Sequence, residues 1–177
     1  MIVGQNWLVV LDMVNNVRLE IELYEPMRIW LQQYLEDKYK GARIITIDSH
    51  SRNLDFFLEK NGVIDQYPQV IGLDIQIDVL GIIIKGCKAQ IVFIEAKKTQ
   101  LNLHDLGQLW AYCKLCDPAE AFLLSSVHLG SLNKIFNNLG RFDLLDFGDG
   151  RRFKQMQVGK WDIKSNSIDF KTLIPKM

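Results

Sequence analysis

Short apolar runs and helically spaced apolar positions divide the chain into alternating segments. Runs rich in Ile, Val, Phe and Leu predict strands at Ala42–Asp48, Leu73–Ile84, Gln90–Ala96 and Ala119–Ser126. Apolar residues that recur every three or four positions predict helices from Pro26 to about Tyr39, from Ser49 to Asn61 and from Leu103 to Cys116. Asn102 is a good N-cap for the last of these helices, and Asp105 three residues later comes close to a capping box. The central part of the chain therefore reads as helix, strand, strand, strand, helix, strand, with a short helical connection before the second strand.

The pattern before Pro26 fits two structures. Trp7–Met13 is mostly apolar and Val17–Leu23 alternates, so the Asn15-Asn16 pair between them predicts a hairpin. A single helix from Trp7 to Tyr24 also fits, because its apolar residues share one helical face.

The pattern after Ser126 predicts a helix, a strand and a weakly alternating tail. We expect the helix at Ser131–Leu139 and the strand at Phe142–Phe147, followed by a tight turn at Gly148-Asp149-Gly150. The tail around Trp161 and Ile168 predicts edge strands.

The two central runs flank a Lys85-Gly86-Cys87-Lys88 turn, which predicts a β-hairpin with a type II′ loop. If Lys85 pairs with Lys88, then Asp78 falls opposite Glu95, and directly opposed Cβ atoms lie roughly 4.5–5.5 Å apart. Lys97 shares a face with Glu95, because side chains on a strand alternate. The turn therefore predicts that Asp78, Glu95 and Lys97 meet in one place.

Facing carboxylates in an apolar segment point to a bound cation. Two carboxylates repel one another, and their burial is costly without compensation. Mg²⁺ binds carboxylate oxygens and keeps open positions for water and phosphate, and we expect Mn²⁺ to substitute for it. The alternative is a surface pair neutralised by Lys97, with no ligand.

Asp78, followed after a spacer by Glu95-Ala96-Lys97, resembles the PD-(D/E)XK nuclease superfamily, with the restriction-endonuclease-like fold. Ile77 stands where the family pattern has proline, at a position that varies in the family. Gln108 and Tyr112 resemble the Gln-x-x-x-Tyr element of some exonuclease-type branches. The resemblance covers roughly Tyr24 to Ser126.

The resemblance implies an α/β fold with a mixed central sheet, helices on both faces and an αβββαβ core. It also implies Mg²⁺-dependent hydrolysis of DNA. Asp78, Glu95 and the Ala96 carbonyl would bind the metal, Lys97 would position the attacking water, and Gln108 and Tyr112 would orient the substrate.

Two further carboxylates are auxiliary candidates. Many members of the family place a glutamate of the first helix near the metal, which suggests Glu25, although acidic residues also favour a helix N-terminus for electrostatic reasons. Asp74 shares the predicted strand face of Asp78 and could replace it as the metal ligand.

Composition indicates one globular domain. A chain of 177 residues with 48% hydrophobic and 24% charged residues can bury a core, here a nuclease-like core at about 24–126 with a C-terminal extension at about 127–177. Without a long apolar run or a basic secretory start, we expect no membrane association. Three cysteines without framework spacing indicate a cytoplasmic protein with reduced thiols.

The formal net charge is zero, but basic residues concentrate in 85–114 and in the C-terminal third. Lys98, Arg151, Arg152 and Lys154 are therefore candidates for contacts with DNA phosphates.

Together these patterns predict a DNA endonuclease of the restriction, repair or recombination kind, acting as a homodimer because two strands need two sites. The same residues are compatible with RNA and with exonucleolytic cutting. The alternative from another class is a noncatalytic nucleic-acid-binding or assembly subunit that retains the nuclease fold. A third is an unrelated α/β protein with a coincidental Glu-x-Lys.

Overall fold

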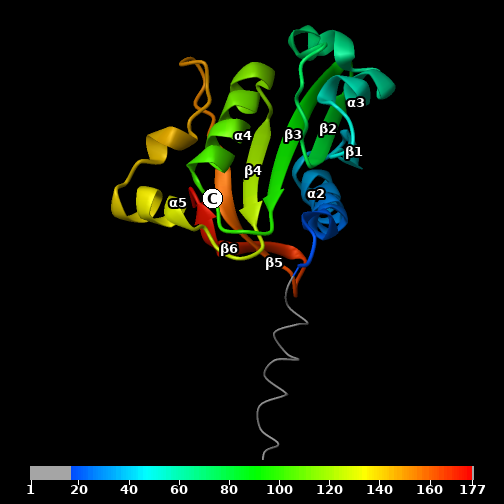
Figure 1. Cartoon of the computed structure of the whole chain (residues 1–177). Coiled ribbons are helices and arrows are strands. Elements are labelled where there is room, and N and C mark those ends of the chain that lie inside the picture. The colour runs from blue at the N-terminus through cyan, green and yellow to red at the C-terminus, as the bar shows by residue number, and fades with distance from the viewer. Residues whose placement is uncertain (1–16, 177) are drawn as a thin grey trace, which may run out of the picture.

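A six-stranded sheet forms the centre of the computed structural model, which describes residues 17–176 (Figure 1). Its strands are β1 (Arg43–Asp48), β2 (Val79–Lys85), β3 (Lys88–Lys97), β4 (Glu120–Ser125), β5 (Gln157–Asp162) and β6 (Ser167–Ile174). They lie side by side in chain order. The β3–β4 and β4–β5 pairs are parallel and the other pairs are antiparallel. The predicted α/β class with a mixed sheet is confirmed.

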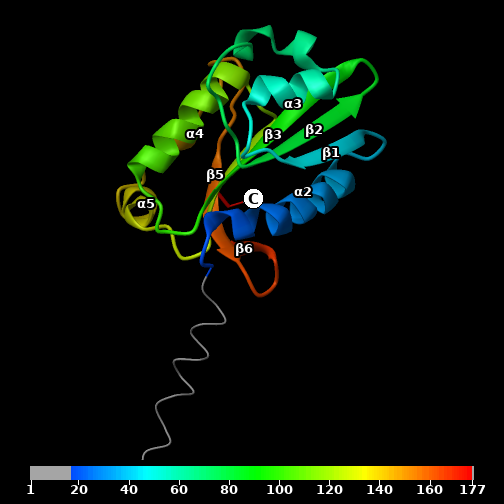
Figure 2. The same ribbon diagram turned by 45° about the vertical axis from the view of Figure 1, so that its right-hand side comes forward.

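Helices cover both faces of this sheet. They are α2 (Tyr24–Lys38), α3 (Leu54–Lys60), α4 (Leu103–Cys116) and the single turn α5 (Ser131–Asn133). Four short 3-10 helices are described, namely η1 (Glu20–Leu23), η2 (Ile64–Gln66), η3 (Pro68–Val70) and η5 (Phe142–Leu145). The segment η4 (Lys134–Asn138) is a π-helix. Figure 2 shows α2 on one side of the sheet and α3 and α4 on the other. None of the described helices is long and apolar enough to cross a membrane.

Alternation along β3 creates two separate cores. Ile91 and Phe93 belong to the core beneath α3 and α4, whereas Val92 and Ile94 pack on the side of α2. Both sets are fully buried, so β3 reads as a continuous apolar run rather than an alternating one. Continuing this alternation places Glu95 on the α4 side of the sheet.

The face of α2 that meets the sheet follows a four-residue spacing. Leu23, Met27, Leu31 and Leu35 are all 2% exposed or less. Gly81 of β2 lets the helix approach, because a Cβ there would lie 2.9 Å from a Leu35 methyl group. Burying each of these leucines stabilises the fold by about 1.5–3 kcal/mol.

Several predicted local features are confirmed. Gly86 has a φ of +62° while Cys87 does not have a positive φ, which is the type II′ pattern. Asn102 caps α4 in a capping box with Asp105. The predicted strand at Ala119–Ser126 is present as β4.

The predicted strand at Val17–Leu23 is wrong. This segment contains η1, which leads directly into α2. The four-residue spacing of buried side chains on α2 extends back to Leu23, so this segment follows the helical pattern. A strand would bury Leu19 and Ile21, but these are 60% and 48% exposed. The other half of the predicted hairpin, Trp7–Met13, lies outside the described residues.

The first central strand is shorter than predicted, because β2 begins at Val79 rather than Leu73. Its neighbour β1 ends at Asp48, so the preceding residues have no strand partner on that side. Their backbone bonds instead to the start of α3, where Leu54 N–H donates to the Ile75 carbonyl at 2.8 Å.

Two C-terminal predictions also change. The segment predicted as a strand at Phe142–Phe147 is η5 followed by an isolated bridge between Asp146 and Gln155. The tail does form strands, but only β6 is at the edge, because β5 pairs with both β4 and β6. The C-terminal extension therefore continues the same sheet as the predicted core.

Candidate active site

The hairpin register brings Asp78, Glu95 and Lys97 together at one end of the sheet. Pairing runs from Lys85 opposite Lys88 to Val79 opposite Ile94, as predicted. Asp78 directly precedes Val79, and Glu95 and Lys97 follow Ile94 on the α4 side of β3. The Lys97 ammonium lies 2.9 Å from Glu95 Oε1.

Beyond the last backbone pair of the hairpin, a side chain just before β2 accepts a hydrogen bond from the backbone of β3. Asp78 Oδ2 accepts this bond from the Ala96 N–H at 2.8 Å. The N–H and C=O of one strand residue point to the same side, so the Ala96 carbonyl is also directed toward β2 and Asp78. A carboxylate and a main-chain carbonyl oxygen are thus brought to the same edge, as the nuclease resemblance implies.

The site holds more negative charge than its immediate surroundings neutralise. Glu95 is 4% exposed, and its Oε2 has no hydrogen-bond partner among residues 17–176. Burial, and then the charge of Asp78, raise the pKa of Glu95 to about 7. Burial also raises the pKa of Asp78, against the opposing effects of the Ala96 N–H and Lys97. A buried carboxylate oxygen in this state calls for a proton or a cation.

Lys97 stays positively charged despite its position. Burial by itself lowers the pKa of Lys97, but the charges of Glu95, Asp78 and Glu20 outweigh it, and the net effect is a raised pKa. Its side chain is 19% exposed, so the ammonium borders solvent. It can therefore contact a solvent-borne phosphate oxygen as well as Glu95.

The third carboxylate near the site is Glu20, not the predicted Glu25. Glu20 Oε1 lies 3.8 Å from the Lys97 ammonium, and its Oε2 accepts from the Lys98 N–H at 2.9 Å. Glu25 pairs instead with Arg28 at 2.6 Å, and its side chain is 58% exposed. Because η1 extends the helical path backwards, the carboxylate that reaches the site comes from one turn earlier.

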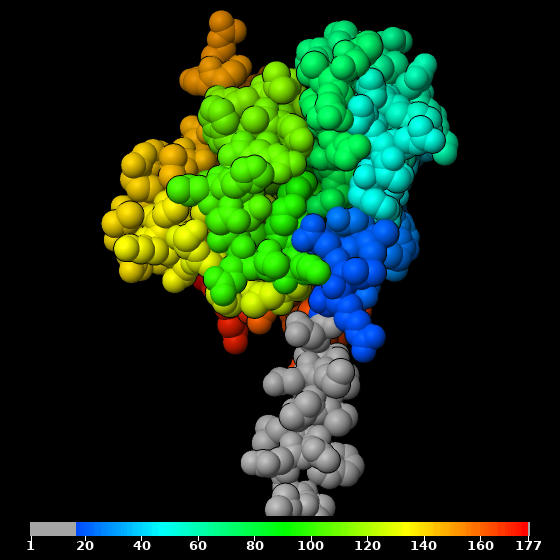
Figure 3. All heavy atoms as spheres, in the orientation of Figure 1, coloured from blue at the N-terminus to red at the C-terminus, as the bar shows by residue number. Residues whose placement is uncertain are grey.

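Figure 3 shows this end of the molecule, where the blue start of the described chain abuts the green atoms that follow β3. The contact is stabilised from both sides, since the Lys98 ammonium donates to the Arg18 carbonyl at 3.0 Å. Lys98, a predicted DNA contact, therefore lies beside the site, and its ammonium already has a partner.

Tyr24, at the start of α2, supports Asp78. Its hydroxyl acts on that carboxylate so as to lower the pKa of Asp78, while burial and the charge of Asp78 raise the pKa of Tyr24 well above its usual value. The His50 ring lies 5.0 Å from the Tyr24 ring, and its Nδ1 pairs with Asp48. Sequence patterns offered no signal for Tyr24, because an aromatic residue at a helix start reads as part of the core.

Gln108 and Tyr112 contact one another rather than the carboxylates. Gln108 Nε2 lies 3.3 Å from the Tyr112 hydroxyl, and the Tyr112 ring packs against the core beneath α4. Within residues 17–176, no hydrogen bond joins either residue to Asp78, Glu95 or Lys97. Asp74 is exposed and precedes β2, so Asp78 is the aspartate that the structure places against Glu95.

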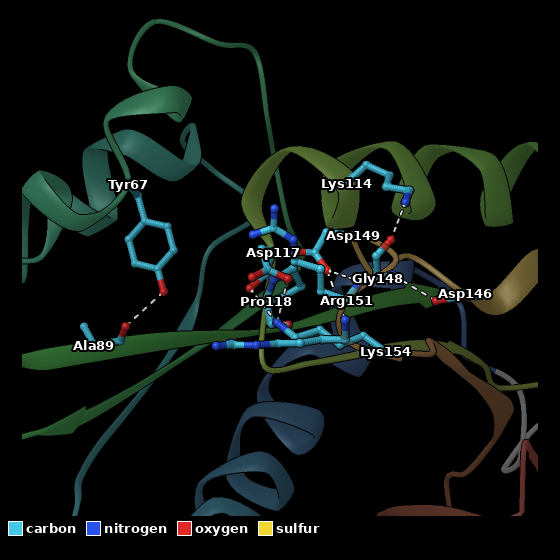
Figure 4. Close-up of polar contacts among 11 residues, drawn as sticks. Tyr67, Ala89, Lys114, Asp117, Pro118, Asp146, Gly148, Asp149, Arg151 and Lys154 are labelled. Carbon is cyan, nitrogen blue, oxygen red and sulfur yellow. Dashed lines mark hydrogen bonds and ion pairs between the residues drawn. The ribbon is translucent and has the colours of Figure 1, made fainter.

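The remaining basic candidates lie at the opposite end of the sheet. Figure 4 shows the loop with Arg151 and Lys154 against the C-terminal end of α4. The Lys154 ammonium bonds to Asp117 Oδ1 at 2.6 Å and to the Pro118 carbonyl at 3.1 Å. Arg151 and Arg152 have exposed side chains, and their N–H groups donate to Asp149. These residues do not share one surface with Lys97 and Lys98.

The donor set fits one hard divalent cation. Across the described part of the chain, no three His, Cys, Asp or Glu side chains are grouped as metal ligands. Asp78, Glu95 and the Ala96 carbonyl supply two carboxylates and one main-chain oxygen, and Mg²⁺ is often bound through one or two carboxylates with water and phosphate completing its shell. The unpaired Glu95 Oε2 is the observation that favours such an ion.

Comparison with protein-family models, with curated proteins and with solved structures finds no match to this chain, so its function is inferred from these side chains themselves.

Proposed function

We propose that the protein is a metal-dependent nuclease that hydrolyses phosphodiester bonds in DNA. One observation carries this proposal. Two adjacent carboxylates, one with a buried and unpaired oxygen, meet a charged lysine at the end of a single hairpin. The same three residues carry the resemblance to the PD-(D/E)XK nucleases.

Each residue has a role that follows from its surroundings. Asp78, Glu95 and the Ala96 carbonyl would hold Mg²⁺, which when bound lowers the pKa of a coordinated water and stabilises charge on the phosphate. Lys97 directs its ammonium at the phosphate or the attacking water, since its charge is retained. Tyr24 orients Asp78, and Glu20 orients Lys97.

The proposed substrate is duplex DNA, cut internally by two copies of the chain. Each chain has one such site in its described residues, and cutting both strands at one position needs two sites. Lys98 lies beside the site. We propose that the Lys98 ammonium binds a DNA phosphate once its hydrogen bond to the Arg18 carbonyl is broken.

The test is cleavage of supercoiled and linear DNA with and without Mg²⁺. We expect Asp78→Asn to abolish Mg²⁺-dependent cleavage while the protein stays folded, because the substitution keeps the side-chain volume and removes one charge. Asp74→Asn is the matched control, because it makes the same change at an exposed aspartate just before β2. Equal activity of wild type and Asp78→Asn would overturn the proposal.

Calorimetric titration with Mn²⁺ separates this function from that of a noncatalytic DNA-binding subunit. A nuclease should bind Mn²⁺ at a site that Asp78→Asn removes and Asp74→Asn retains. DNA binding without any such metal site would support the noncatalytic alternative.

A further inference from the structure

A hollow of about 570 Å³ lies at the opposite end of the hairpin from Asp78. It is bordered by the end of α2, the turn between β2 and β3, and the C-terminal loop, through Tyr39, Ile83, Lys85, Lys88 and Arg152 among others. Volumes of roughly 300–1,000 Å³ are usual for small-molecule sites. Its size therefore suits a small ligand.

The charges around this hollow are of one sign. Lys40, Lys85, Lys88 and Arg152 border it, and none of the described residues that line it is acidic. Lys40 pairs with Asp37 at 3.2 Å. No ion pair within residues 17–176 involves Lys85, Lys88 or Arg152.

Two of these cations oppose one another directly. Lys85 and Lys88 are the pair that closes the type II′ turn, so their side chains leave the sheet on the same face. Like charges directly opposite one another in an antiparallel pair are destabilising. An anion between the two ammonium groups would turn this repulsion into attraction.

The elements that present these cations are well anchored. Gln66 spans the turn, since its Oε1 accepts from the Ala89 N–H at 2.8 Å and its Nε2 donates to the Cys87 carbonyl at 3.2 Å. The Tyr67 hydroxyl donates to the Ala89 carbonyl at 3.1 Å (Figure 4). These bonds fix the backbone at the hairpin end, from which the Lys85 and Lys88 side chains project.

The loop that carries Arg152 is fastened to α4 in the same way. The Lys114 ammonium donates to the Gly148 carbonyl at 2.7 Å, and Lys154 bonds to Asp117 (Figure 4). A Cβ at Gly148 would lie 1.9 Å from the Arg152 carbonyl oxygen, so only glycine permits this close approach. The loop is thus folded back on itself, with Arg152 at the hollow.

The hollow also has an apolar wall. Ile83 is 3% exposed at its base, and the ring of Tyr39 borders it, with the Tyr39 hydroxyl fixed to Glu120 at 2.8 Å. Phosphate groups would meet the cationic rim, while a flat, largely apolar body would meet Tyr39 and Ile83. A nucleoside phosphate combines these two chemistries.

Its position separates this hollow from the nuclease site. Lys88 and Lys97 stand at opposite ends of β3, roughly 30 Å apart at the usual rise per residue. Lys85 and Lys88 project on the face that α2 covers, whereas Glu95 and Lys97 project on the α4 face. The hollow and the nuclease site are therefore two separate surfaces of the molecule.

We propose that this hollow is a binding site for a nucleoside di- or triphosphate, with Lys85, Lys88 and Arg152 holding the phosphates. The proposal does not depend on the nuclease function.

The test is calorimetric titration of the full chain with ADP at low ionic strength in EDTA. We expect one ADP per chain, and a loss of affinity of about tenfold or more when Lys85→Gln and Lys88→Gln are combined. The Lys164→Gln, Lys171→Gln double variant is the matched control, because it removes the same charge from exposed lysines at the other edge of the sheet. Arg152→Gln should weaken binding as a second variant.

Several results would overturn the proposal. One is that the wild type does not bind ADP. Another is that the Lys85→Gln, Lys88→Gln variant, shown by thermal unfolding to be folded, binds ADP as tightly as the wild type. An equal loss in the control variant would show general charge attraction. Inorganic pyrophosphate binding as tightly as ADP would rule out the nucleoside contact. A short oligonucleotide that binds more tightly than ADP, and is weakened by the same variant, would make this a nucleic-acid surface.

Asp78→Asn keeps the two proposals distinguishable. It should bind ADP in EDTA like the wild type, whether or not the wild type cleaves DNA.

Discussion

The two ends of the β2–β3 hairpin carry excess charge of opposite sign. At one end, Asp78 and Glu95 share a buried site with Lys97, and Glu95 Oε2 has no hydrogen-bond partner within residues 17–176. At the other end, Lys85 and Lys88 face one another with no acidic partner in that part of the chain. The formal net charge of zero conceals this separation.

The difference between these ends lies in burial. Glu95 is 4% exposed, so its charge is costly in the apolar surroundings and a bound cation can be worth several kcal/mol there. Lys85 and Lys88 are exposed, so water screens their repulsion and only a modest penalty remains. Changes at the carboxylate end should therefore have large effects, and changes at the lysine end small ones.

The largest effect is expected for Lys97→Met, which keeps the apolar stem and removes the charge. Cleavage in single turnover should fall by about 10²–10³-fold, because the ammonium stabilises charge that develops on the phosphate. Mn²⁺ binding should persist, since Asp78 and Glu95 remain. Lys98→Met is the control and should reduce cleavage by a smaller factor. Full activity of Lys97→Met would show that Lys97 has no role in the mechanism.

The next effect is on stability against pH, measured by urea unfolding in EDTA. The pKa of Glu95 is raised to about 7 in the folded protein, so between about pH 4.5 and 7 the folded state holds a proton that the unfolded state has lost. The free energy of unfolding should fall as the pH rises through this window, by on the order of 2–3 kcal/mol. The raised pKa of Asp78 acts in the same direction.

Two variants sharpen this measurement. Glu95→Gln should flatten the dependence on pH, whereas Glu59→Gln, at an exposed position, should leave it unchanged. Mg²⁺ should restore stability above pH 7, because a cation replaces the lost proton. A stability curve that rises over this range would contradict the assignment of a raised pKa to Glu95.

A smaller effect is expected for Tyr24→Phe. Losing the hydroxyl that favours the charged form of Asp78 should weaken Mn²⁺ binding and cleavage by about tenfold, which corresponds to about 1–1.5 kcal/mol. Tyr34→Phe is the matched control, because it removes a 2.6 Å hydrogen bond to Glu120 at the other end of α2. The control should lower the stability of the fold without changing the affinity for Mn²⁺. If both variants bind Mn²⁺ with the same affinity, Tyr24 does not contribute to the metal site.

The smallest effect belongs to the lysine end. Combining Lys85→Gln with Lys88→Gln should raise the free energy of unfolding by about 0.2–1 kcal/mol at low salt, because a like-charge pair is removed. High salt should abolish the gain by screening the charges of the wild type. Destabilisation by the double variant would show that these lysines have partners the structure does not reveal.

Local rules predicted the hairpin well. Its register followed from the length of one turn, and the capping box of α4 followed from Asn102 and Asp105, which lie three residues apart. Each feature depends on neighbours in the chain or on two strands joined by a tight turn. The expectation that Asp78 lies beside Glu95 was of this kind.

Predictions that depended on which segments far apart in the sequence lie together in the fold were less accurate. Glu25 was the auxiliary candidate because the helix was predicted to begin near Pro26, but the helical path begins earlier and it is Glu20 that lies near Lys97. Arg151 and Lys154 were grouped with Lys98 on charge alone, yet the segment between the parallel strands β4 and β5 returns the chain to the far end of the sheet, where Lys154 meets Asp117.

The sequence by itself determined the strands of the hairpin, the turn between them and the three side chains that the turn aligns, because turn geometry and side-chain alternation are short-range properties. Only the tertiary structure decided that Tyr24 and Glu20 join those side chains, that Gln108 and Tyr112 bond to one another, and that four basic residues surround a hollow at the opposite end. These outcomes depend on how α2, α4 and the C-terminal loop pack on the sheet, and that packing is set by the whole buried core rather than by any one stretch of residues.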